Sequence, residues 1–171
     1  MMNIEPYLYQ MERNGLSLTW LVRDITDEQA KWRPDPDSWS ILEVMYHMID
    51  AEREDFRQRV NYLLNMPGEP FPPIFPETWP MERKYNERDL MTSIKTFVNE
   101  RAKSIDWLRN LKTPNWQNIT THPEFGDISA ADMFAAWVVH DNLHIRQANE
   151  LIHAWMVKEL DGLMVEYAGE W

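Results

Sequence analysis

The chain has 171 residues, no cysteine, and a formal net charge of −11 from 17 basic and 28 acidic residues. This length is enough for one domain with a substantial hydrophobic core, so we expect a single domain over residues 1–171. The lack of cysteine excludes disulfides, thiolate metal ligands and a cysteine nucleophile. The negative charge argues against nucleic acid and membrane surfaces as partners.

The N-terminal sequence argues against export. Residues 1–6 contain no basic region followed by an apolar stretch, and the chain has no run of 18 apolar residues. A signal peptide needs the first feature and a membrane-spanning helix needs the second. We therefore expect a cytoplasmic protein.

Four segments repeat apolar residues with a helical period. The second segment begins at a capping box formed by Ser40 and Glu43, in which the two residues satisfy each other's free backbone N–H groups. The fourth has a similar start at Ser129 and Asp132, and Pro114 ends the third. These signals predict helices at about 4–24, 41–64, 87–111 and 129–160.

The connections between these helices differ in length. Residues 66–80 hold six of the eleven prolines, which excludes a helix and favours an extended crossover. Residues 120–127 are expected to form a loop, because no alternation of apolar and polar residues persists long enough to indicate a strand. The sequence therefore predicts an all-α four-helix bundle with a long Pro-rich connection between helices 2 and 3.

Two histidines on the fourth predicted helix form the strongest candidate for a functional site. His140 and His144 are four residues apart, so they point from the same face of the helix. That face also carries Met133, Trp137 and Leu151, and must cover the core or a cleft. Because burying two imidazoles without partners is costly, the pair indicates either a metal site or hydrogen-bonded core histidines.

His47 on the second predicted helix is a possible third ligand. It lies off the main apolar stripe, close to Asp50 and Glu54. It is either an exposed surface histidine or part of an accessible pocket. In a pocket, Asp50 and Glu54 become candidate catalytic residues that orient a ligand, bind the metal or act as a base, and spacing does not choose among these roles. Three neutral imidazoles with an open position suit a catalytic metal such as zinc.

Several other motifs are absent. The segment 140–144 lacks the zinc-protease motif, because Asp141 stands where a glutamate is needed. His122 in a loop and His153, on the other side of the helix from His144, are better explained as structural or exposed residues. Nucleotide-binding and serine-hydrolase signatures are missing, so those activities lack support.

The site residues resemble those of a known family. Trp39-Ser40-Ile41-Leu42-Glu43 followed by His47 is similar to the start of the second helix in the DinB-like (DinB/YfiT) superfamily. Residues 121–126 resemble the loop before its last helix, and residues 167–171 resemble its ending. His140-x-x-x-His144-x-x-Gln147 resembles its metal-binding signature. The resemblance implies a four-helix bundle in which His47, His140 and His144 hold one divalent metal, with zinc or nickel expected.

The same resemblance leaves two classes of function open. Relatives include metal-dependent transferases and isomerases that use low-molecular-weight thiols, and hydrolases. The first class is an enzyme whose metal activates a water or an external thiol for attack on a small electrophilic molecule, as in a thiol S-transferase or a hydrolase. The second is a non-catalytic module that binds metal or a small molecule. No separate thiol-binding motif is present.

Two further expectations concern assembly and pH. Nine tryptophans and an aromatic C-terminal tail supply apolar surface for an interface, so we expect a homodimer. Since imidazole binds metal only when it is neutral, its ordinary pKa of about 6.5 predicts that metal binding weakens below about pH 6.

Overall fold

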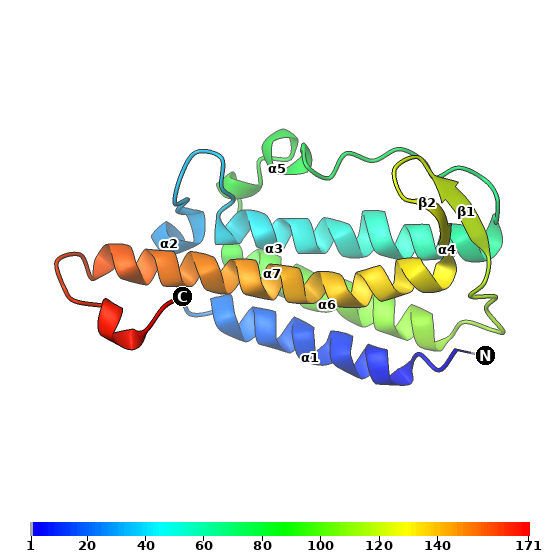
Figure 1. Cartoon of the computed structure of the whole chain (residues 1–171), viewed down its shortest axis with the longest axis horizontal. Coiled ribbons are helices and arrows are strands. Elements are labelled where there is room, and N and C mark those ends of the chain that lie inside the picture. The colour runs from blue at the N-terminus through cyan, green and yellow to red at the C-terminus, as the bar shows by residue number, and fades with distance from the viewer. Residues whose placement is uncertain (1) are drawn as a thin grey trace.

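The structure is a computed structural model that describes residues 2–171. It is mostly helical, and four helical rods lie side by side along its long axis (Figure 1). The first, third and fourth rods are single helices, and the second is made of three consecutive elements. In chain order, the rods are α1 (Glu5–Val22), α3 (Ile41–Asp50) with η1 (Ala51–Phe56) and α4 (Arg57–Asn65), α6 (Leu90–Arg109), and α7 (Ala130–Glu159).

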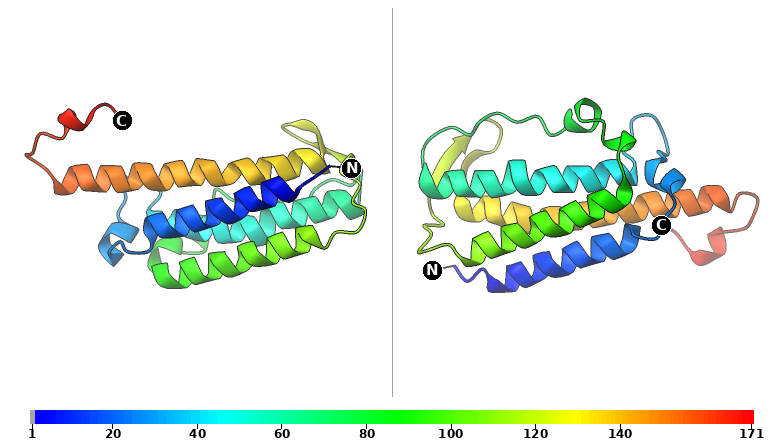
Figure 2. Two further views of the ribbon diagram at one scale, coloured as in Figure 1. Left: turned by 90° about the horizontal axis from the view of Figure 1, so that it is seen from below. Right: turned by 180° about the vertical axis from the view of Figure 1, so that it is seen from behind.

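The rods do not simply alternate in direction. Rods α1 and α7 run one way, and the second rod and α6 run the other way (Figures 1 and 2). Because the second rod and α6 are parallel, the chain between them must return along the bundle. It does so over the outer side of the second rod, and includes α5 (Trp79–Glu82) and the 3₁₀ turn η2 (Tyr85–Glu87).

The smaller elements lie at the two ends of the bundle. The short helix α2 (Asp27–Lys31) follows α1, and the 3₁₀ turn η3 (Glu166–Ala168) lies in the tail that folds back beyond α7 (Figure 1). At the other end β1 (Ile119–His122) and β2 (Gly126–Ser129) form an antiparallel hairpin. The expected loop at 120–127 is therefore corrected to a hairpin. Its strands have four residues each, too few for sequence alternation to identify them.

Local sequence signals explain where the two site-bearing helices begin. Ser40 accepts a hydrogen bond from the backbone N–H of Glu43, and the Glu43 carboxylate accepts one from the N–H of Ser40. Ser129 and Asp132 form the same reciprocal pair at the start of α7. Both predicted caps are confirmed, and each satisfies backbone donors that the first helical turn leaves free.

The second rod contains one irregular turn. Residues 51–56 form a π-helix between α3 and α4. Such turns hold one more residue than an α-helical turn and occur frequently at functional sites. The continuous helix expected over 41–64 is therefore interrupted immediately after the segment that carries His47.

The hydrophobic core consists of two clusters that meet near the middle of the bundle. In α7, residues from Ala130 to Val138 belong to one cluster, and Ala148 and Leu151 belong to the other. His140 and His144 lie between these two sets in the chain. Across residues 2–171, no helix combines the length and the apolar composition needed to cross a membrane.

Candidate metal centre

Three histidine side chains converge between α3 and α7. The Nε2 atom of His140 lies 3.3 Å from Nε2 of His47 and 3.0 Å from Nε2 of His144. One nitrogen from each ring belongs to a group whose members all lie within 4.8 Å of one another. Residues 93 positions apart in the chain, His47 and His140, are thus brought together by the packing of two rods.

The position of His47 contradicts one of the two expectations for this residue. Its side chain is only 7% exposed, so the alternative of an exposed surface histidine is wrong. Its ring lies 5.0 Å from the ring of Trp39, which also lies parallel to His144 with a centroid distance of 6.4 Å. Trp39 therefore covers the outer side of two of the three histidines.

Gln147 sets the tautomer of His144. The amide oxygen of Gln147 lies 2.8 Å from Nδ1 of His144. Because this oxygen only accepts hydrogen bonds, Nδ1 carries the proton and Nε2 presents its lone pair to the other two histidines. Such a partner on the outer nitrogen is a regular feature of metal-binding histidines.

Burial keeps the three rings neutral. Burial, together with the nearby His144, lowers the pKa of His47 to about 3. Burial, reinforced by His144, His47 and Arg101, lowers the pKa of His140 to about 2. For His144, burial lowers the pKa and the hydrogen bond to Gln147 offsets part of that effect. All three side chains are thus in the form that binds a metal.

The donor set fits a cation better than it fits a network of hydrogen bonds. A neutral imidazole has one N–H and one lone pair. Because Nδ1 of His144 carries the proton, Nε2 of that ring can only accept a hydrogen bond or bind a metal. Nε2 of His140 carries at most one hydrogen, so this atom cannot donate hydrogen bonds to both His47 and His144. A divalent cation held by the three Nε2 atoms would satisfy all three lone pairs.

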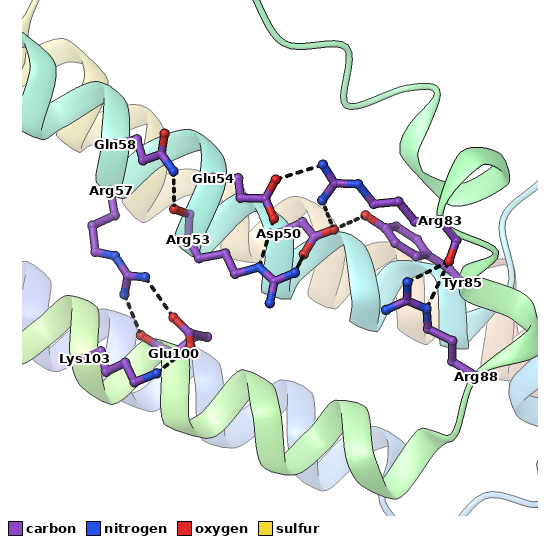
Figure 3. A network of polar contacts seen from close by, with 10 residues as sticks. All are labelled: Asp50, Arg53, Glu54, Arg57, Gln58, Arg83, Tyr85, Arg88, Glu100 and Lys103. Carbon is purple, nitrogen blue, oxygen red and sulfur yellow. Dashed lines mark hydrogen bonds and ion pairs between the residues drawn. The ribbon is translucent and has the colours of Figure 1, made fainter.

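Asp50 and Glu54 lie outside this group of ligand atoms. Figure 3 shows both side chains on the second rod, where they face Arg83, a residue of the connection that leads to α6. Asp50 accepts hydrogen bonds from Arg83 and from the Tyr85 hydroxyl. Glu54 pairs with Arg83 at 2.8 Å and with Arg53 at 3.0 Å. Burial alone would raise the pKa of Glu54, but Arg83 and Arg53 outweigh it and lower this pKa.

A second polar cluster is buried in the core and was not predicted from the sequence. Arg101 from α6 pairs with Glu52 of η1 and with Asp141 of α7. A signal for it exists in the sequence. Arg101 lies four residues from both Phe97 and Ile105, in the middle of the apolar stripe of its helix. A charged residue in that position predicts a buried partner.

Two cavities lie near the three histidines, and one of them is bordered by a histidine of the group. The first, of about 780 Å³, is bordered by His144 and Gln147, by Trp39, and by Trp171 of the tail. The second, of about 1060 Å³, extends under the connection at residues 70–77 and the hairpin, and is bordered by Phe56 and Ala136. The ring of Phe56 lies 4.8 Å from the ring of His140. The first cavity therefore reaches one of the three histidines, whereas the ring of Phe56 separates the second cavity from His140.

Fold and site together define a helical bundle with a candidate three-histidine metal centre. The DinB superfamily model matches residues 10–148, and the chain belongs to this superfamily. Among solved structures it is similar to YfiT from Bacillus subtilis, described as a probable metal-dependent hydrolase with an unusual four-helix bundle topology. That match has a TM-score of 0.78 at 18% sequence identity and covers 89% of this chain and 87% of that chain. A search of curated protein sequences finds no match.

Proposed function

We propose that the protein is a metal-dependent hydrolase of a small molecule, with one divalent metal, zinc or nickel, held by His47, His140 and His144. The convergence of three neutral imidazoles beside two cavities carries this proposal. Three protein ligands leave a coordination position for water or substrate, which catalysis needs and a closed structural site lacks. The description of YfiT as a probable metal-dependent hydrolase supports the same reaction class.

A bound divalent cation would act as a Lewis acid and lower the pKa of a coordinated water or thiol. The chain's own residues prepare the site for this chemistry. Burial holds the ligands neutral, and Gln147 fixes the ring orientation of His144. Trp39 and Phe56 pack apolar rings against the histidines, which limits the access of water to them.

Both predicted catalytic carboxylates pair with Arg83 and neither borders either of the two cavities; of the two, we propose Glu54 rather than Asp50 as the proton acceptor because it is more accessible. The Glu54 side chain is 33% exposed, whereas the Asp50 side chain is 3% exposed and has Arg53, Arg83 and Tyr85 as partners. Accepting a proton breaks fewer contacts at Glu54. Glu54→Gln should therefore lower turnover with little effect on the free energy of unfolding. Asp50→Asn should lower the free energy of unfolding with a smaller effect on turnover.

The presence of two cavities favours a second candidate function. Hydrolysis uses one organic substrate and water, and one cavity is enough for it. Group transfer needs room for two organic molecules at the same centre, as in a metal-dependent thiol S-transferase. The cavity at His144 would hold one molecule, and a second molecule in the other cavity would have to reach the centre past Phe56 beside His140. Transfer to a low-molecular-weight thiol is therefore the alternative reaction.

An activity screen separates these proposals from a non-catalytic binding module. Protein purified without a histidine tag is tested on esters and amides in water, and on electrophiles with added small thiols, before and after removal of the metal by a chelator. Hydrolysis that needs metal but no thiol supports the hydrolase. Turnover that needs both supports the transferase. Activity that survives complete metal removal, or no turnover with any substrate, contradicts both.

A further inference from the structure

The buried guanidinium of Arg101 connects all four rods of the bundle. It donates to both carboxylate oxygens of Asp141 on α7, at 2.7 and 2.6 Å. It also donates to Glu52 of η1 at 3.0 Å and to the backbone carbonyl of Met11 on α1 at 2.7 Å. Arg101 itself comes from α6. The side chains of the three charged residues are between 1% and 5% exposed, so this cluster is inside the core.

The cluster contacts the two ligand-bearing segments directly beside their histidines. Asp141 follows His140 in α7, and Glu52 lies in the π-helical turn that continues α3 after His47. Around that turn, Asp50 at the end of α3 and Glu54 in η1 pair with Arg83, while Glu52 pairs with Arg101 in the core. The guanidinium therefore ties together the two chain segments whose separation sets the distance between His47 and His140.

A second path runs through aromatic rings. The indole N–H of Trp137 donates to Glu52 at 2.7 Å, and the Trp137 ring stacks on Phe56 with 7° between the ring planes. Phe56 in turn packs its edge against His140. Glu52 thus pairs with Arg101 and also, through Trp137, positions the Phe56 ring that contacts His140.

Stability alone does not explain such a cluster. Removing three charges from water costs several kcal/mol per ion, and replacing a buried ion cluster by neutral residues of similar volume is often neutral or stabilising. One oxygen of Glu52 also lacks a hydrogen-bond partner among residues 2–171. What the cluster does supply is geometric specificity, because the planar fork of Arg101 fits carboxylates in only a few orientations.

We propose that Glu52, Arg101, Asp141 and Trp137 form a positioning clamp that holds the two ligand-bearing rods at the spacing the metal requires. The clamp touches neither substrate nor metal, and acts through the backbone of η1 and α7 and through Phe56. It rests on the proposed metal centre. Its loss should weaken metal binding while the metal-free protein stays folded.

The test measures zinc affinity by competition with a chromophoric chelator. The triple variant Glu52→Gln, Arg101→Met, Asp141→Asn removes all three charges together and leaves no buried ion unpaired. We expect its metal-free thermal midpoint to stay within a few degrees of the wild type and its zinc Kd to rise at least tenfold. The visible absorption of bound Co²⁺, which reports ligand geometry, should change as well.

Trp137→Phe provides a test at constant charge. It removes the donor to Glu52 and keeps an aromatic ring against Phe56, and we expect a zinc Kd at least threefold higher with an altered Co²⁺ spectrum. It also carries the test if the triple variant does not fold. The matched control is Arg57→Met, which removes another arginine–carboxylate pair, that with Glu100, between the second rod and α6. This control should bind zinc like the wild type.

The outcomes separate the clamp from the metal centre itself. If the wild type binds neither zinc nor nickel, the proposed function fails and the clamp fails with it. If the wild type binds zinc and the folded variants bind it equally well, only the clamp is overturned. Weak binding by the triple variant with normal binding by Trp137→Phe would assign the effect to charge, and would also overturn the clamp.

Discussion

The amide oxygen of Gln147 accepts a hydrogen bond from Nδ1 of His144, and this single contact decides which nitrogen of that ring faces the other two histidines. Gln147→Leu removes the acceptor and frees the ring to change tautomer and orientation. Loss of such a partner commonly weakens metal binding by about 10- to 100-fold. We expect a loss of this size in chelator competition at neutral pH. Asn149→Leu, an exposed position on the same helix, is the control, and equal affinities in both variants would contradict the assignment.

His144→Ala should abolish stable metal loading. Two imidazoles on different rods remain, and they hold a divalent ion far less tightly than three. We expect about one ion per chain in the wild type after desalting, and much less than one in the variant, as measured by elemental analysis of untagged protein. His153→Ala is the matched control, because His153 lies on the same helix and stacks on Trp171, outside the metal-binding group. Equal loading of His144→Ala and wild type would remove His144 from the ligand set.

The metal-free protein should lose stability in mild acid. Burial lowers the pKa of His47 to about 3 and that of His140 to about 2, whereas both are about 6.5 in the unfolded chain. Between these values the unfolded chain binds more protons than the folded protein. The free energy of unfolding is therefore at its full value above about pH 6.5 and falls as the pH is lowered toward 3.

Urea unfolding at several pH values between 7.5 and 5.5 checks this expectation. Carboxylates with ordinary pKa values contribute little in that range. His140→Gln, which has no titrating ring at this position, should show a shallower dependence on pH than the wild type. Identical slopes for the two proteins would show that His140 is not held neutral by burial.

Ser40→Ala should destabilise the protein more than Ser129→Ala. Both serines cap a helix through a reciprocal pair, but Ser40 is fully buried and its hydroxyl also donates to Asn86 at 2.7 Å. Loss of an N-cap costs about 1 kcal/mol, and an unsatisfied buried partner adds about 1 kcal/mol or more. Urea unfolding should therefore give about 2 kcal/mol for Ser40→Ala and about 1 kcal/mol for Ser129→Ala. Equal losses would mean that the Asn86 contact contributes nothing.

The homodimer stays a prediction. Among the tryptophans the large exposed rings are those of Trp20 and Trp171, with 62% and 70% of their surface exposed. Tyr9 and Leu16 share an exposed side of α1 with Trp20, so this helix offers the apolar surface for a second copy. Light scattering at micromolar concentration should give the mass of a dimer, and Leu16→Glu should shift it toward the monomer. A monomeric wild type would contradict the predicted homodimer.

The helices and the shared face of His140 and His144 could be predicted because their signals are local. The caps at Ser40 and Ser129 fix where two helices begin, and the four-residue spacing of His140 and His144 places both rings on one face. The burial of His47 could not be predicted in this way. A helical wheel compares a residue with its own helix, and His47 is buried by Trp39 and by the two histidines of another rod.

Other features depend on contacts between distant segments. The π-helical turn at 51–56 places Glu52 against Arg101 and Glu54 against Arg83, and no local pattern in the sequence identifies these partners. The pH dependence of metal binding also depends on contacts between distant segments. The expected limit near pH 6 used the ordinary pKa of imidazole, and burial moves the pKa of each of these rings downward, so protons compete with the metal only in more acidic solution.

The outer wall of the larger cavity is built from parts of the chain that do not belong to the four rods. It consists of residues 70–77 of the connection and residues 121–125 of the hairpin, whereas the inner wall consists of η1, α4 and α7. Insertions and substitutions in such connecting segments leave the packing of helices intact. Relatives can thus diverge in what they accept by reshaping this wall, while the three histidines stay where the bundle holds them.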